Sequence, residues 1–246
     1  MKAPSWSDGD LLDELNSLSP EGLLRWSCEN HEGRAGIFTS FQNTGCVLVD
    51  MSRRVAPQLR VITVDTLRLH RETYQLIRTM EERYGLGVER YQPDLDRVKT
   101  MIEQHGEYLF FDSVAKQEYC CGIRKVQPNQ RALETVDVWI AGVRRDHAKS
   151  RESTPRAQFV QQNGRSILKL CPLADWTEER VWQYIHENDV PYSELYSKGY
   201  SSIGCKICTT PTLPGEPKRA GRWRWTNQLD PDQHKECGIH RDGSGI

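Results

Sequence analysis

The segment AGIFTSFQNTG at residues 35–45 decides the fold. An apolar, strand-forming run leads into small, hydroxyl and amide residues, and a helical pattern follows to Val55. The same alternation recurs along the chain, with apolar runs at 60–66, 88–93 and 136–142 and helical patterns at 72–84 and 95–105. Such alternation is typical of βαβ units, whose parallel strands are covered by helices on both faces. We therefore predict an α/β fold with a doubly wound, mostly parallel sheet over roughly residues 30–170.

The segments outside this core differ in composition. Before it, Ser19 can cap an amphipathic helix. After it, a helix follows Asp175 or Thr177, either of which can serve as its cap. Residues 197–225 are rich in Gly, Pro, Ser, Cys and Arg, and so long a loop in a compact domain is usually functional or fastened. We divide the chain into an N-terminal helical extension (1–30), an α/β domain with an irregular C-terminal loop (31–228) and a flexible tail (229–246).

Composition restricts the class of protein. The 246 residues carry 33 basic and 34 acidic side chains, a net charge of −1, and 37% of the residues are hydrophobic. This is enough apolar surface for a packed core, while a net charge near zero argues against nucleic acid or an anionic membrane as the main partner. No apolar run approaches a membrane span, and the start MKAPSWSDGD lacks the apolar region of a secretory signal. We expect a cytoplasmic protein, and the sequence is compatible with a homo-oligomer.

The eight cysteines fall into two compact pairs and four single residues. The pairs are Cys120-Cys121 and Cys205-x-x-Cys208, and together they could supply four thiolates to one inorganic centre. Adjacent cysteines suit a multi-iron cluster better than one small ion, so we rank a [4Fe–4S] cluster first, zinc second and a redox disulfide third. The alternative is that Cys120 and Cys121 are core residues. Three of the single cysteines lie in apolar contexts and are assigned to packing: Cys28, Cys46 and Cys171.

Cys237 stands apart, in the polar segment KECGIH. Lys235 and His240 would favour its thiolate, whereas Glu236 would disfavour it. A cysteine on a polar tail is poorly placed for packing and well placed for a nucleophile that enters and leaves a pocket. We interpret Cys237 as that nucleophile.

Three basic groups lie beside the cysteine pairs or at a strand end. They comprise Arg124-Lys125, then Arg144-Arg145 with Lys149 and Arg151, and finally Lys218, Arg219, Arg222 and Arg224. The second group follows the carboxyl end of the strand at 136–142, where α/β folds bind ligands. In a chain of near-zero net charge, this grouping favours a small polyanionic substrate over a nucleic acid.

The turn Ser40–Gly45 joins the first strand to its helix, and it would direct backbone N–H groups at a phosphate. It does not match the Gly-x-x-x-x-Gly-Lys-Ser/Thr phosphate loop. Asp65-Thr66, at the end of the second strand, could contact a ribose or an adenine edge.

Taken together, these segments resemble the thioredoxin-dependent assimilatory adenylyl-sulfate (APS) reductases, relatives of the phosphoadenylyl-sulfate (PAPS) reductases. The resemblance extends from about residue 20 to residue 240. Its motifs are TSFQNTG (39–45), VDTLRLHRETY (64–74), CCGIRKVQP (120–128), WIAGVRRDHAKSR (139–151), CPLADWT (171–177), VPYSELYSKGYSSIGCKICT (190–209), RAGRWRW (219–225) and KECGIH (235–240).

The resemblance implies a fold of the adenine-nucleotide alpha-hydrolase type and an enzyme that reduces APS to sulfite and AMP with reduced thioredoxin or glutaredoxin. It implies a [4Fe–4S] cluster on Cys120, Cys121, Cys205 and Cys208. It also implies a catalytic set of Cys237, Lys125, Arg219 and Arg222. The substrate-binding residues that we predict on this basis are Ser40, Phe41, Gln42, Thr44, Gly45, Asp65, Thr66, Leu67, Arg144, Arg151 and His240.

The chain departs from the family pattern at two places in the predicted nucleotide pocket. Gln42-Asn43 stands where many relatives have a Gly and an acidic residue, and Leu67 stands where Asp-Thr-Gly is frequent. Two other functions stay open: PAPS reduction, and a zinc-stabilised ATP-binding thiolation module. The latter should retain an acidic, Gly-rich pyrophosphate loop, which Ser40–Gly45 does not provide.

Overall fold

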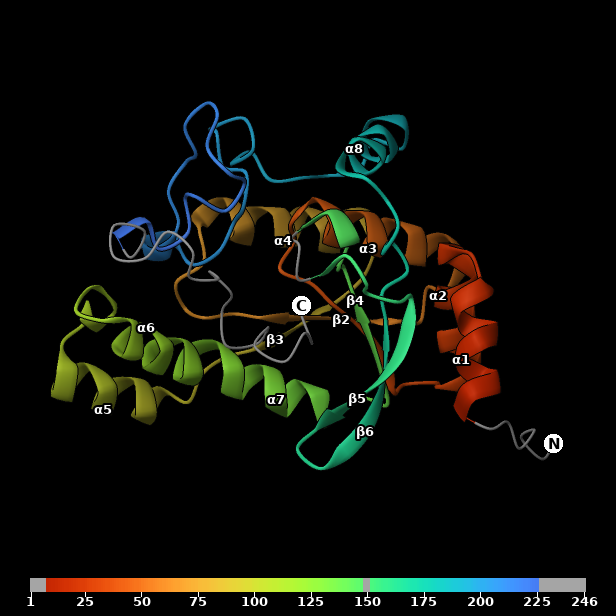
Figure 1. The fold of residues 1–246 in the computed structure, drawn as a ribbon, viewed down its shortest axis with the longest axis horizontal. Coiled ribbons are helices and arrows are strands. Elements are labelled where there is room, and N and C mark those ends of the chain that lie inside the picture. Colours follow the sequence, from red (N-terminus) through yellow and green to blue (C-terminus); the bar gives the residue numbers. More distant parts are fainter. Residues whose placement is uncertain (1–7, 148–150, 226–246) are drawn as a thin grey trace.

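The computed structural model describes residues 8–147 and 151–225, and these residues are built around one six-stranded sheet (Figure 1). The strands are β1 (Ala35–Phe38), β2 (Arg60–Val64), β3 (Val88–Tyr91), β4 (Val138–Ala141), β5 (Ala157–Gln162) and β6 (Arg165–Leu170). Their order is β3-β2-β1-β4-β6-β5. All neighbouring pairs are parallel except β5 with β6. The predicted α/β fold with a mostly parallel sheet is confirmed.

Helices cover both faces of this sheet. The longer helices are α1 (Asp8–Ser17), α2 (Pro20–Asn30), α3 (Asn43–Val55), α4 (Arg71–Tyr84), α5 (Leu95–His105), α6 (Val114–Cys121), α7 (Gln127–Leu133) and α8 (Glu178–Glu187). In Figure 1, α3 and α4 lie on one side of the sheet and α6 and α7 on the other. None of the helices in the described ranges is long and apolar enough to cross a membrane.

The alternation of side chains along each strand divides the core in two. In β1, Ile37 packs into the cluster that contains residues of α2, α3, α4 and α8, whereas Phe38 packs into the cluster that contains residues of α7. Ile140 and Trp139 of β4 divide in the same way. Because both faces of each strand are buried, the strands appear in the sequence as continuous apolar runs.

The β5–β6 hairpin is absent from the sequence prediction. Asn163 and Gly164 connect the two strands, with φ angles of 51° and 76°. Two positive φ angles define the turn that best matches the twist of a hairpin, and Asn-Gly is its preferred sequence. The signal was therefore present in the chain, and α-carbon pairing of Gln162 with Arg165 closes the hairpin.

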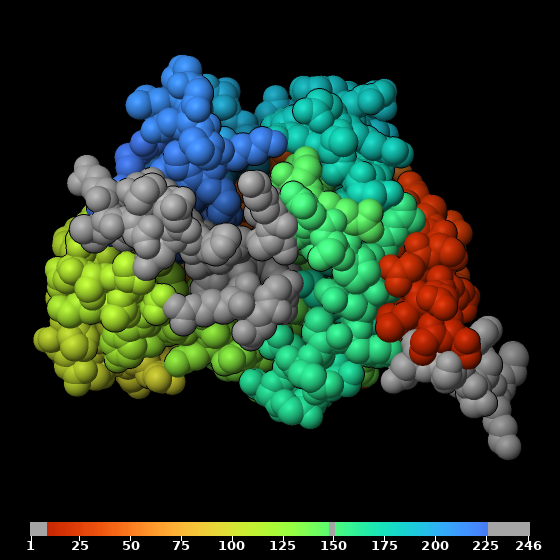
Figure 2. Space-filling view, in the orientation of Figure 1, coloured from red at the N-terminus to blue at the C-terminus, as the bar shows by residue number. Residues whose placement is uncertain are grey.

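The helix caps and the C-terminal loop agree more closely with what the sequence predicts. Ser19 caps α2, and Thr177, rather than Asp175, caps α8. Residues 197–225 contain the short 3-10 turn Lys206–Cys208 and the isolated bridge between Thr209 and Arg222. The end of this segment, which forms the blue surface in Figure 2, packs against α5 and α6, because Trp223 and Trp225 share one apolar cluster with Met101 and Cys120.

The strand order reverses its direction of growth between β1 and β4, since β2 and β3 follow on one side of β1 and β4 lies on the other. In open α/β sheets, ligands bind at such a switch point, in the crevice beyond the carboxyl ends of the strands. The carboxyl ends of β1, β2 and β4 therefore mark where a site is expected.

Candidate active site

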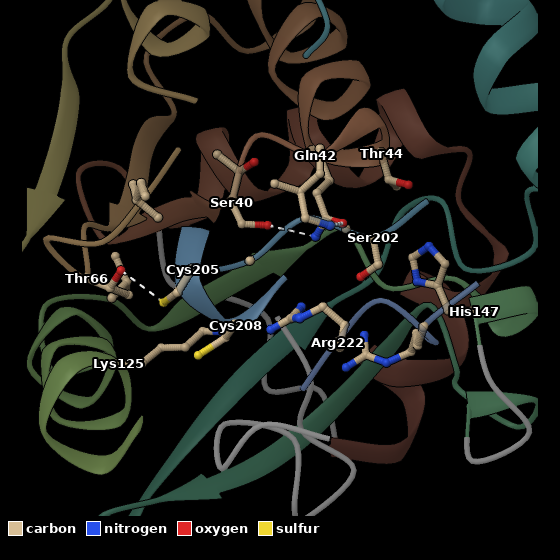
Figure 3. A pocket seen from close by; sticks show the side chains of 18 of the residues that line it. Ser40, Gln42, Thr44, Thr66, Lys125, His147, Ser202, Cys205, Cys208 and Arg222 are labelled. Carbon is tan, nitrogen blue, oxygen red and sulfur yellow. Dashed lines mark hydrogen bonds between the residues drawn. The ribbon is translucent and has the colours of Figure 1, made fainter. Parts of the chain in front are cut away.

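A pocket opens at this switch point. Residues from three strand ends line it, among them Ser40 after β1, Thr66 after β2 and Gly142 after β4. The irregular segments 201–205 and 218–223 complete its wall. Figure 3 shows Thr66, Lys125, Cys205 and Cys208 toward one side of the pocket, Gln42, Thr44, Ser202 and His147 toward the other, and Arg222 between them.

The turn after β1 is held tightly against the strand end. Thr39 Oγ1 accepts a hydrogen bond of 2.9 Å from the Phe41 N–H, and Phe41 is buried with a φ of 56°. A Cβ on Gly45 would lie 2.1 Å from Thr39 Oγ1, so no larger residue fits there without moving the turn. The first turn of α3 is thus fixed at the pocket, where helix N–H groups favour an anion.

Two N–H groups of this first turn already have protein acceptors. The Asn43 N–H donates to the Tyr196 hydroxyl at 3.0 Å, and the Thr44 N–H donates to Asn43 Oδ1 at 2.8 Å. The turn therefore presents fewer unpaired donors than its position alone predicts. Charged side chains around the pocket must supply more of the attraction for a dianion.

Arg144 is fully buried, and its side chain bonds to the first turn of α3. Its guanidinium donates two hydrogen bonds to Asp146, of 2.9 and 3.1 Å, and one of 2.5 Å to Thr44 Oγ1. Burial alone would raise the pKa of Asp146, but the hydrogen bond and charge of Arg144 outweigh it and lower that pKa. Asp146 also accepts a hydrogen bond from the Glu178 N–H at 2.9 Å, which ties the start of α8 to β4.

His147 lines the pocket beside Arg144 and Arg151, and sequence reasoning missed it. Burial, together with the charges of the neighbouring arginines, lowers its pKa to about 3. Its Nδ1 lies 3.4 Å from both the Arg144 backbone N and Arg151 Nη1. The ring is therefore neutral at physiological pH, so it can accept hydrogen bonds from the arginines. The strand-end rule that selected Arg144 applies equally to His147.

The four cysteines of the predicted centre all line this pocket, although 83 residues separate the two pairs in the sequence. Cys120 and Cys121 end α6, directly before the π-helical turn Gly122–Val126. Cys208 is buried, and the Cys205 thiol lies 3.2 Å from Thr66 Oγ1. Single π-helical turns are frequent at functional sites. The structure thus brings both pairs to one wall.

Buried arginines surround these thiols. Arg124 donates a hydrogen bond to the Cys120 thiol and another, of 3.1 Å, to the Thr66 carbonyl. Burial raises the pKa of Cys120, and the charges of Arg68 and Arg124 oppose that rise. Burial likewise raises the pKa of Cys208 to about 12, opposed in part by Arg222.

Three guanidinium nitrogens here are buried without a protein acceptor: Arg68 Nη1, Arg124 Nε and Arg222 Nε. A buried N–H group of a cation that has no acceptor is costly unless an anionic group engages it. Four thiolates around a cluster with net negative charge would provide that group. The residues present therefore fit an anionic iron–sulfur centre.

Within the described ranges, no three His, Cys, Asp or Glu side chains form a group that could hold a metal ion. The ranking of a [4Fe–4S] cluster above zinc therefore stays a prediction from the sequence. The described cysteines are free thiols, and Cys46 and Cys171 are fully buried as predicted for packing residues, while Cys28 is half-buried.

The predicted basic residues differ in whether they line the pocket. Lys125, Arg151, Arg219 and Arg222 line the pocket. Lys218 also lines it but forms an ion pair with Glu178, and Arg224 forms a bidentate pair with Glu216 away from the pocket lining.

Three predicted substrate residues do not line the pocket: Phe41, Asp65 and Leu67. Asp65 is buried and accepts hydrogen bonds from the Leu67 N–H at 2.9 Å, the Tyr74 hydroxyl at 2.7 Å and Gln92 Nε2 at 2.9 Å. Its carboxylate therefore shapes the turn after β2, where Leu67 has a φ of 58°.

The other predicted residues are placed as follows. Ser40, Gln42, Thr44, Gly45, Thr66, Arg144 and Arg151 line the pocket. Cys237 and His240 lie outside the described residues.

Comparison with known proteins agrees with this geometry. The family model of the phosphoadenosine phosphosulfate reductase domain matches residues 35–211. Adenosine 5'-phosphosulfate reductase of Allochromatium vinosum is 40% identical over 203 residues, 82% of this chain and 77% of that protein. The enzyme of the same name from Sinorhizobium fredii strain USDA 257 is 37% identical over 230 residues, 94% of this chain and 89% of that protein.

Solved structures show the same relationship. A phosphoadenylyl-sulfate reductase of Candida auris, in a phosphate complex, has a TM-score of 0.70 and 30% identity, covering 85% of this chain and all of that one. FMN adenylyltransferase of Candida glabrata, with a TM-score of 0.55 and 16% identity over 88% of this chain and 71% of that one, shares the fold alone. These likenesses confirm the adenine-nucleotide alpha-hydrolase type of fold that the resemblance implied. With its pocket at the β1–β4 switch point and its match to the family model over most of its length, the chain belongs to the phosphoadenosine phosphosulfate reductase family.

Proposed function

We propose that the protein is an adenylyl-sulfate reductase (thioredoxin), which reduces adenosine 5'-phosphosulfate to sulfite and AMP in sulfate assimilation. The observation that carries this proposal is one pocket that joins the Ser40–Gly45 turn, four cysteines and eight lysine and arginine side chains in a chain 40% identical to an adenosine 5'-phosphosulfate reductase. Adenylyl sulfate is a small polyanion with an adenine, which matches a nucleotide-binding fold with a cation-rich wall.

In the first step, the Cys237 thiolate attacks the sulfur of the sulfonate group. A sulfur–sulfur bond forms, the bond from that sulfur to the bridging oxygen breaks, and AMP leaves with the electron pair. The attacking thiolate and the substrate are both anionic, so cations must offset their repulsion. Lys125, Arg219 and Arg222 are proposed to do this, because charge stabilisation at a preorganised site is the largest catalytic contribution in many enzymes.

The position of the chain before Cys237 is compatible with this step. Trp225 is anchored, since its Nε1 donates to the Phe110 carbonyl at 3.1 Å and its ring lies 4.4 Å from that of Phe111. Cys237 follows Trp225 by twelve residues, which span up to about 40 Å when extended. The thiol can therefore reach the pocket from this anchor.

In the second step, a thiol of reduced thioredoxin or glutaredoxin attacks the Cys237 sulfur. The bond to the sulfonate breaks, sulfite leaves, and a mixed disulfide forms that the second thiol of the partner resolves. The enzyme thiol is regenerated and the partner is oxidised, so the two electrons that reduce the sulfonate come from the partner. His240 is proposed to lie near the substrate when the tail is engaged.

Cys120, Cys121, Cys205 and Cys208 would hold a [4Fe–4S] cluster. When bound, that group supplies a compact centre of negative charge that orders the cysteine-bearing segments, without a change of its own oxidation state in the reaction. Arg124 and Arg68 are proposed to balance the charge at this wall, because Arg124 Nε and Arg68 Nη1 are buried without a protein acceptor. Lys125 follows Arg124 and lines the pocket, so it is proposed to lie between the thiols and the sulfonate.

PAPS is the second candidate substrate, because the family model and the Candida auris structure both carry that name. The test is sulfite formation from each nucleotide with reduced thioredoxin, using the full chain and its Cys237→Ser variant. We expect faster turnover of APS and no sulfite from the variant, which should still bind AMP. Equal or faster turnover of PAPS would contradict the substrate assignment, and normal turnover by the variant would contradict the nucleophile.

A further inference from the structure

Gln42 occupies the N-cap position of α3, where Ser, Thr, Asp or Asn would accept a first-turn N–H. Its side chain makes no capping hydrogen bond. Instead, Oε1 accepts a hydrogen bond of 3.0 Å from the Ile203 N–H, and Nε2 lies 3.2 Å from Ser40 Oγ as its donor. Gln42 therefore spans the pocket turn and the segment that leads to Cys205, as Figure 3 shows for the Ser40 contact.

Tyr196 makes a second connection between the same two parts. Its hydroxyl accepts the Asn43 N–H at 3.0 Å, and its ring stands perpendicular to Trp182 of α8 at 4.9 Å. Burial raises the pKa of Tyr196, so the hydroxyl stays protonated. Residues at both ends of the 196–203 segment are thus bonded to the start of α3.

Further contacts link Ile203 to the segment that bears the Cys205 thiol. Cys205 lies two residues after Ile203, its thiol contacts Thr66 Oγ1, and the Lys206 N–H donates to the Arg68 carbonyl at 2.7 Å. A Cβ on Gly204 would lie 2.5 Å from the Arg222 guanidinium, so the chain rests directly on that side chain. Because the chain between Ile203 and Cys205 is closely packed, a shift of Ile203 would also shift Cys205.

We propose that Gln42 is a positioning residue that couples occupancy of the phosphate turn to the placement of the segment bearing Cys205 and Cys208. This inference rests on the proposed function, since it assumes that an adenosine 5'-phosphate occupies the turn. A nucleotide bound at this turn restrains Gln42 further, and the Gln42 amide then holds Ile203 and the cysteine segment that follows it. Because coupling between two sites is reciprocal, a well-ordered cysteine segment also strengthens nucleotide binding by the same factor.

The test measures amide hydrogen–deuterium exchange of the peptide that covers residues 197–208, by mass spectrometry, on the full-length protein as isolated, with and without saturating AMP. One hydrogen bond of this kind predicts protection by AMP of about 3- to 10-fold in the wild-type protein. Gln42→Met keeps the length of the side chain but removes both amide bonds, and its exchange rates in this peptide should be the same with and without AMP. The matched control is Gln183→Met, because the Gln183 amide bonds only within α8, to Glu187.

Gln42→Asn guards against a folding defect, since Asn is a favourable N-cap residue but is too short to reach Ile203. It should lose protection while retaining the thermal stability of the wild-type protein. Equal protection of the wild-type protein and both Gln42 variants, or none in the wild-type protein despite AMP binding measured by calorimetry, overturns the coupling alone. Failure of AMP to bind the wild-type protein overturns the proposed function together with it.

Discussion

Replacing Arg144 by Met tests whether this arginine supports the pocket or binds the substrate. The change removes the bidentate pair with Asp146 and the hydrogen bond to Thr44 Oγ1, while it keeps most of the buried volume. Breaking a buried ion pair costs about 3–5 kcal/mol because the remaining charge has no partner. The Asp146 side chain is 30% exposed, so water screens part of this cost and we expect about 3 kcal/mol.

The assay is urea denaturation of the full chain, with Arg145→Met as the matched control. Arg145 is exposed, and its side-chain bond is to the Thr154 carbonyl, so its loss should change the unfolding free energy by about 0.5 kcal/mol. Arg144→Met should also weaken AMP binding, because Thr44 and the start of α8 lose their common anchor. The reasoning is refuted if Arg144→Met is as stable as Arg145→Met and only substrate binding falls.

Three further predictions follow from single contacts. Gly45→Ala places a Cβ against Thr39 Oγ1, and we expect about 1–3 kcal/mol of destabilisation with weaker AMP binding by calorimetry; unchanged values of both would contradict the close packing. The pKa of His147, about 3 in the folded protein against 6.5 for an ordinary histidine, means that the unfolded chain binds the extra proton as the pH falls. His147 should therefore lower the free energy of unfolding by up to about 2 kcal/mol between pH 7 and pH 5. The His147→Gln variant should lose this pH dependence, which denaturation at both pH values measures. Lys169 is buried without a hydrogen-bond partner over the Trp139 ring, and burial lowers its pKa to about 8. Because the folded state disfavours the ammonium form, the stability of the wild-type protein should rise between about pH 8 and 10.5. At pH 7, Lys169→Met should be more stable than the wild-type protein by about 1–3 kcal/mol. A less stable variant would show that the amine has a favourable partner.

The sequence was informative where one type of residue carries its own chemistry. The spacing of Cys120-Cys121 and Cys205-x-x-Cys208 predicted a shared centre, and the structure brings both pairs to one pocket wall. The strand at residues 35–38 and its helix followed from an apolar run with both faces buried. These inferences succeed because composition and local order suffice to make them.

Inferences that depend on tertiary partners were less complete. Arg144 looked like a substrate-binding cation, yet Asp146 and Thr44 engage its guanidinium. Asp65 stands at a strand end but also accepts hydrogen bonds from Tyr74 and Gln92, which no local pattern reveals. The exposed fraction and pKa of His147 likewise depend on segments that meet only in the folded chain.

Gln42, where the chain departs from the family pattern, also depends on a tertiary partner that the sequence does not reveal. The sequence indicated a changed nucleotide contact, while the structure shows an amide that bonds Ile203, 161 residues away. A difference from a family pattern can therefore mark a new internal connection as readily as a new ligand contact.

The central claim is that Cys237 accepts the sulfonate of an adenylyl sulfate bound in this pocket. The most direct measurement is the intact mass of the full chain after incubation with APS in the absence of any thiol reductant, combined with quantification of released AMP and peptide mapping. The account predicts one added sulfonate per chain, located on Cys237, and one AMP released for each. AMP release without an adduct, or an adduct on any other cysteine, would contradict it.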